Sequence, residues 1–79
     1  MPKEKVKRTM NYVMSARIRG EIAQQHISID KACEYAGVSR FTLYKLFDDP
    51  TKHFPNTLRL MRNLTIPIED VREMIQYPW

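Results

Sequence analysis

Residues 28–47 read SIDKACEYAGVSRFTLYKLF, a pattern typical of two short helices joined by a tight turn. Ser28 and Ser39 each stand where a helix would begin, and serine is among the residues that cap helix N-termini best. Gly37 can adopt the positive φ that ends a helix, and only Val38 separates it from the second serine. The segment therefore predicts a helix-turn-helix over residues 29–47.

The two expected helices differ in the side chains that they would bury and expose. The first has Asp30 in its first turn, where an acid favours the helix dipole, and it offers small residues for close helix packing: Ala32, Cys33 and Ala36. The second would bury Leu43, Leu46 and Phe47. Its opposite face would present Ser39, Arg40, Phe41, Tyr44 and Lys45. A helix with hydrogen-bonding, cationic and aromatic groups on one face fits the major groove of B-DNA.

The rest of the chain also has helical periodicity. Apolar side chains recur along residues 11–25, 55–64 and 68–76, in the stripes Val13, Met14, Ile18 and Ile22; Thr57, Leu58, Leu60, Met61 and Leu64; and Val71, Met74 and Ile75. No segment alternates as a strand would. We therefore expect an all-α, compact five-helix domain over residues 12–79, after a basic, flexible arm over residues 1–11.

Composition restricts the class of protein. The chain has 79 residues, enough for one domain, and no segment approaches the ~18 apolar residues of a membrane span. The single Cys33 can form no internal disulfide, and no signal peptide is recognisable. We expect a cytoplasmic protein that is not an enzyme and uses no cofactor or metal. The lone His26 and His53 have no ligand partners in the sequence, and the paired acids fit helix ends: Asp48 with Asp49, and Glu69 with Asp70.

The net charge of +4 is unevenly distributed. Residues 1–19 carry +5 and residues 40–62 carry +3, whereas residues 20–39 and 63–79 carry −2 each. This asymmetry favours one face that meets a polyanion. Ordinary solubilising charges would give a similar count.

Residues 16–72 resemble the lambda-repressor-like (Cro and xenobiotic-response-element) helix-turn-helix family. The stretches that carry the resemblance are CEYAGVSRFTLYKL at 33–46, DDP at 48–50 and NTLRLMRNLTIPIEDV at 56–71. The resemblance implies a DNA-binding transcriptional regulator, which reads double-stranded DNA with the second helix of the motif. Such small repressors are found in phages and mobile elements and often form dimers.

The resemblance implies two sets of DNA contacts. The residues matching base contacts are Ser39, Arg40, Phe41, Tyr44 and Lys45, although Phe41 could instead be a partly buried core residue. Backbone contacts are expected from Ser28, Thr42, Lys52, Lys3, Lys5, Lys7 and Arg8. The family often has a glutamine that holds a phosphate where this chain has Ile29, so that contact is absent.

Other interpretations remain open. AGVSRFTLYKLF at 36–47 also resembles the reading helix of tetracycline-repressor-type regulators, which suggests that Tyr44 touches phosphate, but those proteins need a large ligand domain. Excisionase-type winged helices share similar motifs, but they would need a β-hairpin, and no such hairpin is recognisable in the sequence. Ile29 and Phe41 fit an antitoxin-like or accessory protein-interaction module as well. For the aromatic tail, we expect either packing on the core or a twofold contact centred on Met74, Tyr77 and Trp79.

Overall fold

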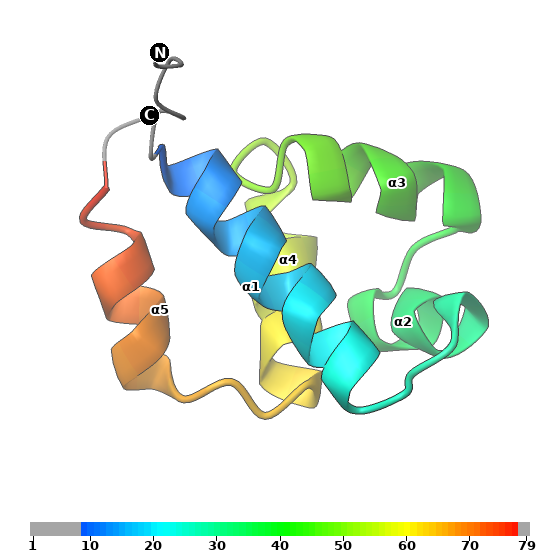
Figure 1. The fold of residues 1–79 in the computed structure, drawn as a ribbon. Coiled ribbons are helices and arrows are strands. Elements are labelled where there is room, and N and C mark those ends of the chain that lie inside the picture. Colours follow the sequence, from blue (N-terminus) through cyan, green and yellow to red (C-terminus); the bar gives the residue numbers. More distant parts are fainter. Residues whose placement is uncertain (1–8, 78–79) are drawn as a thin grey trace, which may run out of the picture.

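The computed structural model describes residues 9–77. This part of the chain forms five helices and no strand: α1 (Met10–Gln24), α2 (Ile29–Ala36), α3 (Arg40–Asp48), α4 (Phe54–Asn63) and α5 (Ile68–Met74). Figure 1 shows α1 crossing the molecule between α5 and α3, with α4 behind it. The all-helical prediction is confirmed for the described residues. None of their helices is both long enough and apolar enough to cross a bilayer.

The helix boundaries follow from capping residues. Ser28 Oγ accepts a hydrogen bond from the backbone N–H of Lys31 at 3.1 Å, and Ser39 Oγ accepts one from that of Thr42 at 3.3 Å. Gly37 ends α2 with a φ of 73°, in the left-handed region that favours glycine. Two helices joined by a glycine turn are therefore present where the sequence predicted them, and α3 continues one residue past the expected end, to Asp48.

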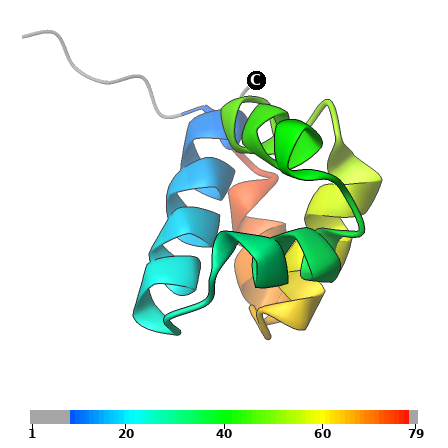
Figure 2. The same ribbon diagram turned by 90° about the vertical axis from the view of Figure 1, so that its right-hand side faces the viewer.

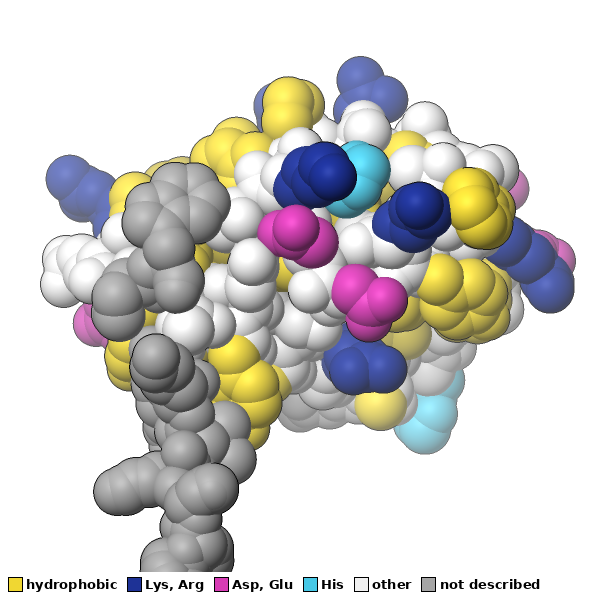
Figure 3. Space-filling model, turned by 90° about the horizontal axis from the view of Figure 1, so that it is seen from above, with side chains coloured by type: hydrophobic (Ala, Val, Ile, Leu, Met, Phe, Trp, Pro, Cys, Tyr) yellow, Lys and Arg dark blue, Asp and Glu magenta, His cyan; other side chains and the backbone are white. Residues whose placement is uncertain are grey.

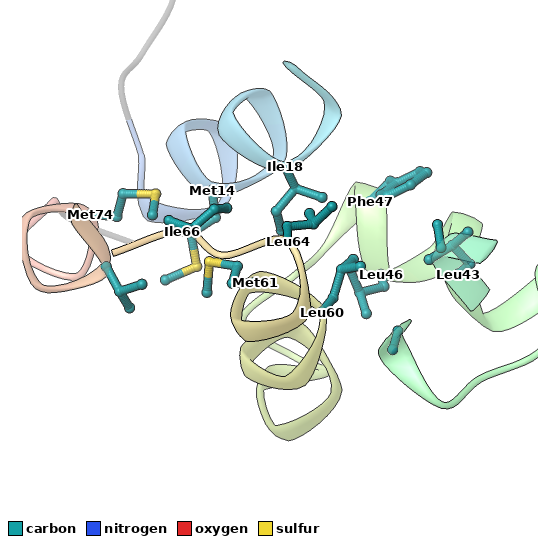
Figure 4. Close-up of a cluster of buried hydrophobic side chains, with 13 residues drawn as sticks. Met14, Ile18, Leu43, Leu46, Phe47, Leu60, Met61, Leu64, Ile66 and Met74 are labelled. Atoms are coloured by element: carbon teal, nitrogen blue, oxygen red, sulfur yellow. The ribbon is translucent and has the colours of Figure 1, made fainter. Parts of the chain in front are cut away.

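One hydrophobic core joins all five helices. Figure 2 shows α2 in front and α3 above it, with α1 on the left, α4 on the right and α5 behind α2. The side chains in the core come from every helix, as Figure 4 illustrates, and include Met14, Ile18, Ala32, Ala36, Leu43, Leu46, Phe47, Leu60, Met61, Leu64, Ile66, Val71 and Met74. The core therefore holds α3 in place from one side only.

Polar contacts connect neighbouring helices. The guanidinium of Arg17 bonds Glu21 within α1 at 3.1 Å and reaches Asp70 on α5 at 2.9 Å. Partial burial lowers the pKa of Arg17, but the hydrogen bonds and charges of these two carboxylates outweigh it, so its pKa is raised. The side-chain amide of Asn63 donates to the Tyr35 carbonyl at 2.9 Å, which joins α4 to α2.

Several expectations about the helices were wrong in detail. The helix α1 begins at Met10, inside the segment expected to be an arm, because Thr9 caps it. Leu58 is 37% exposed, since the buried stripe of α4 follows the spacing of residues 57, 60, 61 and 64 and leaves residue 58 beside it. Ile75 is 45% exposed, because α5 ends one residue earlier.

Candidate nucleic-acid interface

The inner side of α3 fixes its position. Leu43 and Leu46 are fully buried and Phe47 is 8% exposed, as the sequence predicted. Figure 4 shows these side chains on the core side of α3, with Leu46 facing Leu60 of α4. Because one face of the helix is anchored in this way, the side chains on its other face project outward from a rigid support.

The outer face of α3 carries large side chains that the core leaves exposed. Phe41 is 71% and Tyr44 51% exposed, so Phe41 is a surface residue and not part of the core. Arg40 and Lys45 are also exposed. Figure 3 shows the molecule from the side on which α3 lies, where Lys and Arg side chains stand beside hydrophobic ones and acidic ones lie between them. The face is mixed, not uniformly basic.

Cations lie over aromatic rings around α3. Lys45 Nζ stands 5.0 Å from the centre of the Phe41 ring, and the Arg19 guanidinium lies 5.6 Å from that of Phe47. Tyr44 packs edge-on against Phe47, with 6.2 Å between ring centres. These distances are in the range of cation–π and aromatic contacts, so the rings of Phe41 and Phe47 each lie next to a positive charge.

Arg40 has a partner on the neighbouring helix. Its Nε and Nη2 atoms both donate to Asp30 Oδ1, at 3.0 and 2.8 Å. The hydrogen bond and charge of Asp30 raise the pKa of Arg40, so the guanidinium stays charged. Both side chains are largely exposed, at 63% for Arg40 and 76% for Asp30, and the pair is open to solvent and to ligands.

The hydroxyl groups of the predicted site are used as caps. Ser28 and Ser39 accept the N-terminal hydrogen bonds of α2 and α3. The Ser39 hydroxyl also donates to Thr42 Oγ1 at 3.2 Å. Both serines are exposed and Thr42 is half-buried, so all three lie at or near the surface at a helix N-terminus.

The remaining predicted residues are dispersed. Lys52 is exposed in the loop after α3. Met74 was expected at a twofold contact, but it is only 4% exposed and belongs to the core, because α5 turns Val71 and Met74 inward. Tyr77 is 36% exposed. The other predicted contacts lie outside the described residues: Lys3, Lys5, Lys7, Arg8 and Trp79.

Sequence reasoning missed Asp30 and Arg19 as neighbours of this face. Asp30 was interpreted only as a favourable acid in a first helical turn, and its ten-residue separation from Arg40 follows no single-helix pattern. Ile29 is half-buried against the core. It also lines a shallow groove between α1 and α3 with Arg19, Ile22, Ala23, His26, Ile27, Tyr44 and Phe47.

A second groove lies between α4 and α5, and no residue of α3 lines it. Its walls are Pro55, Leu58, Arg59, Met61, Arg62, Ile66, Ile68 and Val71. Among residues 9–77, no group of three or more His, Cys, Asp or Glu side chains is placed to hold a metal ion.

Neither a family model, nor a curated protein, nor a solved structure matches this chain. The exposed residues on the outer face of α3 are therefore the structural basis for a proposed function.

Proposed function

We propose that this chain binds double-stranded DNA in a sequence-specific manner, with α3 in the major groove. The observation that carries the proposal is the division of α3 into a buried side and an exposed side. Leu43 and Leu46 have no exposed surface, whereas Phe41 and Tyr44 are more than half exposed next to Arg40 and Lys45. Exposing two large aromatic rings on an otherwise well-packed helix favours a binding role for that side.

The chemistry of the exposed side suits base edges. The guanidinium of Arg40 can donate two parallel hydrogen bonds to guanine O6 and N7, and the ring of Phe41 can pack on a thymine methyl group. Lys45 can reach a base or a phosphate. Around these contacts, the hydroxyl groups of Ser28 and Thr42 and the ammonium of Lys52 are proposed to hold the DNA backbone, with the basic residues of the N-terminal segment.

The fold we propose is lambda-repressor-like, and the role is that of a small cytoplasmic transcriptional regulator. We propose that it acts as a repressor does, by occupying DNA. A phage or mobile-element origin fits the resemblance. A homodimer would place two copies of α3 about one DNA turn apart, and Tyr77 is the exposed residue that we propose for the contact.

Selection of bound duplexes from a random pool tests this function. The proposal predicts an enriched sequence, palindromic if the chain binds as a dimer, with an affinity that falls steeply as salt rises. Phe41→Ala and Arg40→Ala should each reduce the enrichment. A wild-type chain that enriches no sequence would rule the function out.

The exposure of Phe41 also favours a second candidate, a protein-interaction module that uses the face of α3. In that case the ring of Phe41 would insert into a partner, and Phe41→Ala would abolish binding to that protein while Arg40→Ala would have little effect. The cations next to the rings favour DNA instead, because a partner pocket for aromatic side chains needs no such charges. The same random-pool selection distinguishes the two candidates.

A further inference from the structure

The pair of Arg40 and Asp30 has a geometry that bears on how a base would be read. Asp30 Oδ1 accepts from Nε at 3.0 Å and from Nη2 at 2.8 Å, so it occupies one edge of the planar guanidinium. A guanidinium has five N–H groups. Two of them point to Asp30, which leaves both hydrogens of Nη1 and one of Nη2 for a ligand.

From this geometry we propose that Asp30 is a positioning residue, which presents the free edge of Arg40 to a guanine and thereby sets the base preference at that position. This inference rests on the proposed DNA-binding function and adds a residue to it. The Nη1–Nη2 edge has the two parallel donors that guanine O6 and N7 require, and it remains available while Asp30 is bound.

Two physical effects make such a partner useful. A free arginine samples many rotamers, and fixing it on DNA has an entropic cost that is lower when Asp30 already restricts the side chain. The carboxylate also repels phosphates, which disfavours DNA that offers Arg40 no guanine. Asp30 therefore raises discrimination between sequences and lowers affinity for unrelated DNA.

The main alternative is that Asp30 only competes with DNA for Arg40. Competition by Asp30 would reduce the affinity for every DNA sequence by the same factor. Positioning by Asp30 would instead change the ratio between the affinity for a duplex with the guanine and the affinity for a duplex in which another base replaces it. Asp30 also lies in the first turn of α2, so its removal weakens a favourable charge–dipole interaction. A thermal unfolding curve for each variant checks that the fold is kept.

The chain contains a matched control on the same helix. Glu34 is an exposed acid of α2 whose carboxylate pairs with Lys31 at 3.4 Å and makes no hydrogen bond to Arg40. Asp30→Asn and Glu34→Gln remove the same charge, but only the first weakens the contact with Arg40, because a neutral amide oxygen is a poorer acceptor than a carboxylate. Arg40→Lys is a second control, because lysine has no planar guanidinium that could bind Asp30 along one edge and a guanine along another.

The test uses the full chain and a duplex enriched from the random pool. At one salt concentration, affinity is measured for three duplexes: the enriched duplex, the same duplex with another base in place of the guanine that Arg40 contacts, and an unrelated duplex. Asp30→Asn should lower the guanine discrimination ratio by about 5-fold or more and raise affinity for the unrelated duplex. Glu34→Gln should leave the ratio unchanged, and in the Arg40→Lys background Asp30→Asn should no longer alter it.

Equal ratios in Asp30→Asn and Glu34→Gln would overturn the positioning role and leave the DNA-binding function standing. A rise in affinity for all three duplexes by the same factor would likewise overturn it and identify Asp30 as a competitor. If the wild-type chain enriches no duplex, the proposed function and this role fall together.

Discussion

The inner and the outer side of α3 differ in how strongly the fold constrains their residues. On the inner side, Leu43 and Leu46 are enclosed by the core, and any change there alters how the helix is held. On the outer side, Lys45 lies over the ring of Phe41, and Phe41 and Tyr44 are more than half exposed, so the fold constrains these residue types much less. Residues that the fold does not require are the ones that a function can select. Substitutions on the two sides should therefore have separable effects on stability and on binding.

The largest expected effect is on the inner side. Leu46→Ala would leave a cavity in a fully buried site and should lower the free energy of unfolding by ~2–5 kcal/mol. Phe41→Ala is the matched change on the outer side and should shift it by less than ~0.5 kcal/mol. Urea unfolding followed by circular dichroism measures both. Equal losses for the two variants would contradict the separation of the two sides.

Arg40→Ala should have the next largest effect, this time on binding. Losing a bidentate contact should cost ~1–3 kcal/mol of DNA-binding free energy and blur one base position, with little change in stability. Titration of the enriched duplex and its single-base variants measures this change. If both affinity and base preference stayed at the wild-type level, Arg40 would not be a reading residue.

The turn between α2 and α3 gives a third comparison, between the two glycines. Gly37→Ala should destabilise the chain by ~1–2 kcal/mol, because its φ of 73° is strained for alanine and the new methyl group would also meet the Arg59 side chain. Gly20 lies inside α1 with open space around it, so Gly20→Ala should instead stabilise by up to ~1 kcal/mol. Thermal or urea unfolding measures both, and a change of the same sign in both would contradict this reasoning.

The smallest effect concerns acid stability. The pKa of Glu21 is lowered by hydrogen bonds from Gln25 and Arg17, so the unfolded chain binds a proton at this site more readily than the folded one. Its contribution to stability is complete above the usual glutamate pKa of about 4.3 and is lost as pH falls through the lower folded value. The stability difference between wild type and Glu21→Gln should therefore shrink between pH 6 and pH 3 in urea unfolding. A constant difference would exclude this contribution.

The sequence predicted the helices well because their signals are local. Ser28, Gly37 and Ser39 act on the turns next to them, and the buried stripes repeat at helical spacing. The errors arose where a local pattern was not enough. Leu58 continues an apolar run but lies beside the buried stripe, and Ile75 belongs to the apolar stripe of the last helix but lies just past the end of α5.

The site was harder to predict, because its contacts join separate helices. The exposed side of α3 could be listed from helical periodicity alone. The bond from Arg40 to Asp30 and the position of Arg19 over Phe47 depend on how α2 and α1 pack against α3, which no spacing in the sequence encodes. Side-chain partners across helices therefore require the fold.

The most direct test of the central claim is a nuclear magnetic resonance titration of the isotope-labelled chain with the enriched duplex. If α3 binds DNA through its outer side, the largest shifts in backbone amide signals should fall on residues 39–45, with smaller ones near Ser28 and Lys52. The groove between α4 and α5 should change little. Largest shifts around Leu58 and Ile68, with residues 39–45 unaffected, would contradict the account.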